Sequence, residues 1–375
     1  MAVKYLYIDD ELDSVVKGIK KNLSSHPEKL VITHEKALEW EKQIQFIQNE
    51  IPNYDGILLD LKLEFVDGQA LYHYAPALAQ QLKTLIKKGS ITKDFPILLC
   101  STDDNLRKYH DKTGEDLFAE CFDKMRLGSK DISKFIEHAK AYRQISDNPN
   151  NIKELLAVDS NDADILEEVS QYFERLESVH EKADFLLREV IKPTGILIDE
   201  DTLAIRLGID NSTAKEWNDF TTLLSSCQYN GIYAHYTKER HWWMRGIFQW
   251  WQSNFPSAKP LPLLSTSEKL EIINHNLNLD LKPIILPEYH ESSRLWYKCS
   301  NLILETKDAT KRIIPLAESD GLTYLSPHYP WQDRNYISYN YIIVEGSQEI
   351  FKEIKSLLSP YEIEQFNQLL KLHHT

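Results

Sequence analysis

The chain has 375 residues, of which 42% are hydrophobic and 27% are charged, an ordinary globular composition with room for two or three domains. Its net charge of −14 disfavours nonspecific attraction to nucleic acid or to anionic membranes. The four cysteines contain no CxxC pair, which argues against a zinc site or a disulfide framework and favours a reducing cytoplasm. The N-terminus lacks a signal-peptide core, and no apolar run approaches the ~18 residues of a transmembrane helix. We therefore expect a cytoplasmic protein with no membrane contact.

Apolar segments in residues 1–145 predict five short strands separated by helices. The predicted strands are Tyr5–Ile8, Leu30–Ile32, Gly56–Asp60, Phe95–Cys100 and Ala119–Phe122. Apolar residues at helical spacing predict helices over residues 12–23, 36–49, 75–89 and 131–145. Because right-handed βαβ crossovers join parallel neighbours, this alternation predicts an α/β domain with a doubly wound, five-stranded parallel sheet.

Polar side chains follow these predicted strands at their carboxyl ends. They are Asp9 and Asp10 after the first strand, Asp60 at the third, Ser101 after the fourth and Lys124 after the fifth. Ligands of such sheets bind beyond the carboxyl ends, so these side chains should converge. Carboxylates packed together need a cation to neutralise them, and hard oxygen ligands suit Mg²⁺. A carboxylate can also accept a phosphoryl group, whose charge a metal, a hydroxyl and a lysine would stabilise.

The order of these residues resembles the response-regulator receiver domain of two-component signalling, over about residues 1–145. Asp67 and Gly68 also match the family pattern. The resemblance implies a flavodoxin-like fold in which Asp60 is the phosphoacceptor and Ser101 and Lys124 contact the phosphoryl group. It further implies a Mg²⁺ site made by Asp9, Asp10, Asp60 and the backbone carbonyl of Lys62.

Several positions depart from the family pattern. Glu64 stands where proline is usual, Met125 follows Lys124 where a cis-proline is typical, and Cys121 occupies the place of a common aromatic switch residue. The segment before Pro96 is also longer than in the family, which predicts an extended third helix. These departures leave open a pseudo-receiver, a fold that serves as a docking platform without phosphorylation.

A polar, proline-bearing linker over residues 146–151 ends the predicted receiver domain. We expect a helical region over residues 152–255 and an α+β unit over residues 256–375, which can together form one domain. Residues 161–190 show the spacing of one long helix, which either pairs with its twin in a homodimer or packs on its own domain.

Residues 203–217 resemble a helix-turn-helix, with Gly208 at the turn and Ser212 as the N-cap of the second helix. That second helix carries Lys215 against Glu216 and Asp219, a charge balance that disfavours phosphate contacts. Packing or partner contact is the favoured interpretation, and a DNA-binding response regulator is the alternative.

Residues 229–251 are rich in aromatic side chains interleaved with basic ones. This pattern fits stacking on a nucleotide or a single-stranded nucleic acid, but Trp243, Ile247, Trp250 and Trp251 more often form a buried helix face. A third possibility is a receiver-regulated enzyme with a pocket made by residues 242–251, Tyr289 and His290. No nucleophile–base pair, P-loop or dinucleotide fingerprint is present to favour it.

The sequence as a whole predicts a signalling protein whose receiver domain is phosphorylated on Asp60. The partner expected to donate the phosphoryl group is a sensor histidine kinase or a kinase-like protein. We expect the C-terminal region to act on an effector protein through protein–protein contacts.

Overall fold

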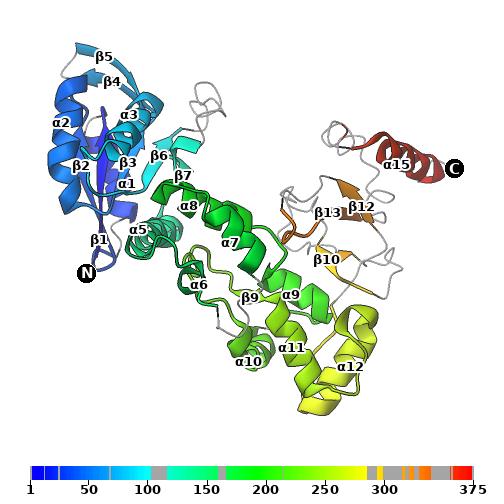
Figure 1. Ribbon diagram of the computed structural model, residues 1–375. Coiled ribbons are helices and arrows are strands. Elements are labelled where there is room, and N and C mark those ends of the chain that lie inside the picture. The colour runs from blue at the N-terminus through cyan, green and yellow to red at the C-terminus, as the bar shows by residue number, and fades with distance from the viewer. Residues whose placement is uncertain are drawn as a thin grey trace. The chain divides into compact units, whose positions relative to one another are not determined.

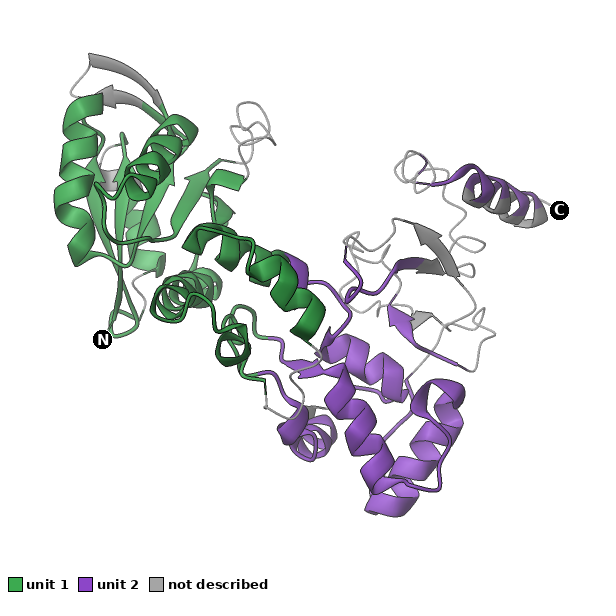
Figure 2. Ribbon diagram, viewed as in Figure 1, with its two compact units in different colours: residues 1–188, 230–238 green, residues 189–229, 239–375 purple. Residues whose placement is uncertain are grey.

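The computed structural model describes residues 2–11, 13–23, 26–66, 69–102, 116–158, 166–212, 214–284, 294–298, 315–316, 321–324, 329–338, 355 and 358–373. Contacts between residues divide the chain into two compact units (Figure 2). Unit 1 comprises residues 1–188 and 230–238, and unit 2 comprises residues 189–229 and 239–375. Within the described residues, no helix is long and apolar enough to cross a membrane.

Unit 1 is built on a five-stranded sheet in the order β2-β1-β3-β6-β7 (Figure 1). Its strands are β1 (Val3–Asp9), β2 (Leu30–Lys36), β3 (Gly56–Asp60), β6 (Ile97–Ser101) and β7 (Glu120–Asp123). Every neighbouring pair is parallel. The order and direction are those of flavodoxin-like doubly wound sheets, so the predicted α/β fold class is confirmed.

Helices cover both faces of this sheet, which explains why its strands are apolar without alternation. Helices α2 (Trp40–Glu50) and α3 (Ala75–Lys87) pack on the face that carries Leu6, Ile57 and Leu99. Helix α5 (Ile132–Asp147) covers the opposite face, where the ring of Phe135 meets Tyr5 at a centroid distance of 5.1 Å. Helix α1 (Asp13–Leu23) connects β1 to β2.

The chain between β3 and α3 differs from the sequence prediction. After Asp60 it forms an antiparallel hairpin, β4 (Lys62–Val66) and β5 (Gln69–Tyr74), before α3 begins at Ala75. Asp67 and Gly68 lie outside the described residues. The hairpin escaped prediction because these short strands pair with each other, away from the main sheet, and carry no apolar run.

The rest of unit 1 extends past the predicted linker. Residues 148–151 join α5 to the short helix α6 (Ile152–Leu155), and α7 (Glu167–Phe173) and α8 (Val179–Phe185) follow. The prediction of one continuous helix over residues 161–190 is wrong. Helix α7 ends at Phe173, and a new helix, α8, begins after Ser178, which caps it in a capping box with Glu181. A π-helical turn over Leu186–Ile191 follows α8. The helix expected to pair in a homodimer is therefore not formed as one piece.

Residues 230–238 return to unit 1 although the chain on either side belongs to unit 2. The Tyr236 hydroxyl donates to Glu120 of β7. The Tyr233 hydroxyl lies 3.2 Å from Nδ1 of His138 in α5. These contacts attach a downstream segment to the edge of the sheet formed by β7.

Unit 2 contains the helix-turn-helix-like hairpin, α9 (Glu200–Leu207) and α10 (Ala214–Thr222). Gly208 ends α9 at φ +74°, and a Cβ there would lie 2.5 Å from Cγ2 of Thr266, so both backbone and space require glycine. The predicted turn at Gly208 is thus confirmed. Leu203, Leu207 and Trp217 are buried in the core of the unit.

The remaining described elements of unit 2 include one pair of strands and two helices that share this core. They are β8 (Leu197–Asp199), β9 (His241–Trp243), α11 (Met244–Asn254) and α12 (Thr266–Leu277). The predicted buried helix face is confirmed for Ile247 and Trp251, and Trp250 is partly buried against the same core. Trp243 instead lies in β9, where its neighbour Trp242 is the fully buried tryptophan. Tyr289 and His290 lie outside the described residues.

Short strand pairs and a helix complete the described part of unit 2. They are β10 (Tyr297–Lys298) with β11 (Pro315–Leu316), β12 (Gly321–Tyr324) with β13 (Asn335–Ser338), and α15 (Pro360–His373). Both pairs are antiparallel. Strands followed by a helix agree with the predicted α+β character of this region.

Candidate functional site

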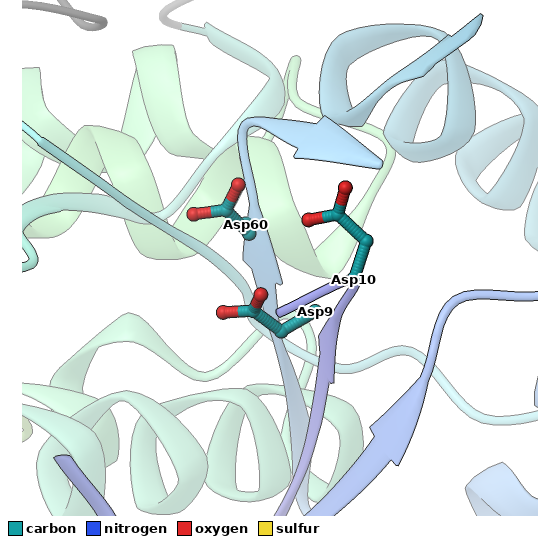
Figure 3. Close-up of side chains that lie close together, drawn as sticks. All are labelled: Asp9, Asp10 and Asp60. Atoms are coloured by element: carbon teal, nitrogen blue, oxygen red, sulfur yellow. The ribbon is translucent and has the colours of Figure 1, made fainter. Parts of the chain in front are cut away.

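Three carboxylates meet at the carboxyl ends of the central strands. Asp9 ends β1 and Asp60 ends β3, and these strands are neighbours in the sheet. Carboxylate oxygens of Asp9, Asp10 and Asp60 all lie within 4.8 Å of one another (Figure 3). Asp9 and Asp60 are buried, and Asp10 is half-buried. The convergence expected from the topology is therefore present.

Lys124 joins two of these carboxylates from the end of β7. Its Nζ lies 2.8 Å from Oδ2 of Asp9 and 3.1 Å from Oδ1 of Asp60. A third acid, Glu11, places Oε2 at 2.9 Å from the same nitrogen. The lysine is itself buried, so one shielded ammonium is shared by three carboxylates. The site carries more negative than positive charge.

Asp9 is held by further donors. The hydroxyl of Tyr7, two residues earlier on β1, donates to Oδ2 of Asp9. The backbone N–H of Glu11 donates to Oδ1 at 2.8 Å. Sequence analysis missed both Tyr7 and Glu11. Tyr7 carried a usable signal, because residues two apart on a strand face the same side.

Burial and the excess of negative charge show in the pKa values. Burial, opposed by Lys124 and the N–H of Lys62 and aided by Asp9, raises the pKa of Asp60 from its ordinary value to about 7. Burial lowers the pKa of Lys124, but Asp60 and Asp9 outweigh this and raise the pKa above its ordinary value. A second cation at the site would favour the ionised form of Asp60.

The donor set fits a hard divalent cation. Asp9, Asp10 and Asp60 offer carboxylate oxygens only, which are the ligands that Mg²⁺ prefers in proteins. The N–H of Lys62 donates to Oδ2 of Asp60 at 3.1 Å, which places the Lys62 peptide beside the cluster. The role of the Lys62 carbonyl as a further ligand stays a prediction.

Ser101 lies at the same edge of the sheet. It ends β6, one residue beyond Cys100, which pairs with Asp60. Its side chain is buried, and within the described residues its hydroxyl has no hydrogen-bond partner. The N–H of Lys124 donates to the Ser101 carbonyl at 2.7 Å. Because buried hydroxyls are usually hydrogen-bonded, this one is available to a ligand oxygen.

Two of the departures from the receiver pattern, Met125 and Cys121, are exposed side chains. Met125 is 81% exposed. Cys121 is exposed, whereas its neighbour Phe122 is buried and stacks on Phe135 at a centroid distance of 5.1 Å. An aromatic side chain on β7 thus packs inward, one residue after the position at which the family has its switch residue.

The helix-turn-helix-like hairpin presents a different chemistry. Its exposed residues on α10 include Lys215, Glu216 and Asp219, a net negative set. Arg240 donates from Nη1 to Oγ1 of Thr221 at 3.0 Å and pairs with Glu200, so its charge is used within unit 2. Among the hairpin residues that the structure describes, no basic stripe of the kind that a DNA-binding helix needs is present.

Comparisons with known proteins add little to this geometry. No protein-family model matches the chain, and no curated protein matches it. The solved structure of an adenylate cyclase from Rhodopirellula baltica aligns with 41% of this chain and 99% of its own length, at 14% identity and a TM-score of 0.28. A TM-score that low supports no argument about fold or function. The function is therefore inferred from the geometry of the acidic site.

Proposed function

We propose that unit 1 is a receiver domain that accepts a phosphoryl group on Asp60 and controls an output of unit 2. The observation that carries the proposal is the convergence of Asp9, Asp10 and Asp60 with Lys124 at the carboxyl edge of the sheet. Burying these charges together costs free energy, so the arrangement is better explained by chemistry than by stability. The buried hydroxyl of Ser101 adds a donor for a phosphoryl oxygen.

In the proposed reaction, a carboxylate oxygen of Asp60 attacks the phosphorus of a partner's phosphohistidine. The new P–O bond forms as the P–N bond breaks, and the departing imidazole nitrogen takes up a proton. Lys124 and the Ser101 hydroxyl stabilise the negative charge on the phosphoryl oxygens. Bound Mg²⁺, held by Asp9, Asp10, Asp60 and the Lys62 carbonyl, would supply electrostatic stabilisation of the same oxygens.

Residues 230–238 support an output route through β7. Glu120 of this strand binds Tyr236, and Nζ of Lys134 lies 5.5 Å from the ring centre of Phe122 and 5.4 Å from that of Tyr236. Lys124 follows the same strand directly. A shift of Lys124 toward a phosphoryl group would therefore act on the strand that holds residues 230–238, which continue on both sides into unit 2. The effector bound by unit 2 is proposed to be a protein.

The experiment that tests phosphoryl transfer is intact-mass analysis after incubation with acetyl phosphate and Mg²⁺. The wild type should gain one phosphoryl group, and Asp60→Asn should gain none. Asp123→Asn is the matched control, because Asp123 also ends a strand of the sheet but lies outside the acidic cluster. It should keep the uptake.

Two outcomes would contradict the proposal. Equal uptake by Asp60→Asn would show that a residue other than Asp60 accepts the phosphoryl group. Absence of uptake from acetyl phosphate, from phosphoramidate and from a phosphohistidine donor would favour a pseudo-receiver that serves as a docking platform.

A further inference from the structure

Strand β1 places three residues in line on the sheet face that α5 covers. Tyr5, Tyr7 and Asp9 alternate with residues of the other face, because side chains two apart on a strand point the same way. All three are fully buried. Two tyrosine hydroxyls therefore lie in the dry interior of the same strand, and each needs a hydrogen-bond partner.

The two hydroxyls find different partners. Tyr5 donates to the backbone carbonyl of Phe135 in α5 at 2.9 Å, a contact that ties the helix to the sheet. Tyr7 donates to Oδ2 of Asp9, the oxygen that also accepts from Lys124.

The Asp9 carboxylate accepts hydrogen bonds at most of its acceptor positions. A carboxylate offers about four acceptor positions, two on each oxygen. Oδ2 accepts from Tyr7 and Lys124, and Oδ1 accepts from the N–H of Glu11. Among the described residues no further donor fills the second position on Oδ1, which leaves it for a cation or for a water bound to it. The donors Tyr7, Lys124 and the N–H of Glu11 thus fix the orientation of the Asp9 carboxylate.

We propose that Tyr7 is a positioning residue of the acidic site. Its hydroxyl turns the Asp9 carboxylate so that one oxygen retains Lys124 while the carboxylate stays close to Asp10 and Asp60 as part of the cation site. Partners that orient a metal ligand in this way typically change metal affinity or activity by about 10–100-fold when they are removed. The inference rests on the proposed function only for the phosphoryl step, because the effect on cation binding stands by itself.

The test compares Tyr7→Phe with Tyr5→Phe in the full chain. Each variant removes one buried hydroxyl from β1 and keeps the ring, but only Tyr7 contacts an acid of the site. Mn²⁺ binding, followed by electron paramagnetic resonance, is the first measurement. Tyr7→Phe should bind Mn²⁺ about tenfold more weakly than the wild type, and Tyr5→Phe should be unchanged. The rate of phosphoryl uptake by Asp60 is the second measurement and should fall in Tyr7→Phe alone.

The outcomes separate the inference from the proposed function. Equal Mn²⁺ affinity in the two variants, or no Mn²⁺ binding by the wild type, would overturn the role of Tyr7. Weaker Mn²⁺ binding by Tyr7→Phe in a protein that takes up no phosphoryl group would support the positioning role and refute the proposed function. If Tyr7→Phe does not fold, 3-fluorotyrosine at position 7 keeps the hydroxyl as a stronger donor. It must then shift Mn²⁺ affinity, and 3-fluorotyrosine at position 5 must not.

Discussion

The carboxyl edge of the parallel sheet and the α9–α10 hairpin are both motifs that the sequence displays, yet they are built in opposite ways. At the sheet edge, Asp9, Asp60 and Lys124 are buried together. In the hairpin, Leu203, Trp217 and Phe220 are buried in an apolar core, and the charged residues of α10 face outward. The buried guanidinium of Arg206 in α9 is paired with Asp333. A buried ion cluster is weak evidence for stability, whereas an apolar core stabilises directly. We therefore interpret the carboxyl edge of the sheet as a functional site and the α9–α10 hairpin as a packing element.

The largest expected effect tests the packing role of the hairpin. Phe220 is fully buried in the core of unit 2, so Phe220→Ala should lower the free energy of unfolding by about 4 kcal/mol. Seven of the eight tryptophans, all except Trp40, belong to unit 2, and their fluorescence in urea would follow the loss. Leu223→Ala, at a site 47% exposed, is the control and should change little. Phe220→Ala should still take up a phosphoryl group, and loss of uptake would show that the hairpin also contributes to the acidic site.

The next effect tests the charge balance of the acidic site. Lys124→Met removes the one ammonium that Asp9 and Asp60 share, which should destabilise unit 1 by about 3 kcal/mol in EDTA. Mg²⁺ should restore much of the loss, because a divalent cation replaces the missing charge. Hydrogen exchange of the β1 and β3 amides, read by mass spectrometry with and without Mg²⁺, measures both changes. Lys130→Met, an exposed lysine near the start of α5, should show neither.

A smaller effect concerns a buried histidine that serves packing in unit 1. The Tyr142 hydroxyl lies 2.5 Å from Nδ1 of His180, and Nε2 lies 2.7 Å from the carbonyl of Asp116, an arrangement that suits the neutral ring. Burial, aided by Lys83, lowers the pKa of His180 from 6.5 to about 4. Between pH 6.5 and about 4, His180 therefore binds a proton in the unfolded chain but not in the folded one. The free energy of unfolding falls as the pH drops through this window.

The expected loss from His180 is about 2 kcal/mol between pH 7 and pH 5. His180→Gln should remove this part of the pH dependence while keeping a polar side chain. Urea unfolding of both proteins by circular dichroism at the two pH values gives the difference. The same pH dependence in wild type and variant would show that His180 does not contribute.

The smallest effect concerns the attachment of residues 230–238. Tyr236→Phe removes the hydrogen bond to Glu120, with an expected loss of about 1.5 kcal/mol in local stability. Amides of residues 230–238 should exchange faster, and those of the parallel sheet should not. Tyr172→Phe, at a site 37% exposed in α7, is the control. Unchanged exchange in Tyr236→Phe would show that this segment is held by other contacts.

Much of the site could be predicted because it follows from strand direction. Parallel strands bring their carboxyl ends to one edge, so acids placed after the first and third strands must meet there. Glu11 could not be assigned in the same way, because its role depends on where Lys124 enters the site. Tyr7 could have been assigned, because it lies two residues before Asp9 on the same strand. The hairpin after Asp60 was missed because local pairing of two short strands leaves no strong periodicity.

Three features could be predicted from the sequence alone: the α/β class of the first unit, the glycine turn at Gly208, and the convergence of Asp9, Asp10 and Asp60 at the sheet edge. Each follows from local order along the chain: apolar runs, a backbone angle, and residues placed directly after strands. The break in the helix expected over residues 161–190 is also local, because Ser178 and Glu181 form a capping box that the sequence displays. Two features emerged only from the folded chain: residues 230–238 belong to unit 1, and Lys124 is shared by three acids. These features depend on contacts between segments far apart in the chain, and such contacts leave no periodic pattern in either segment.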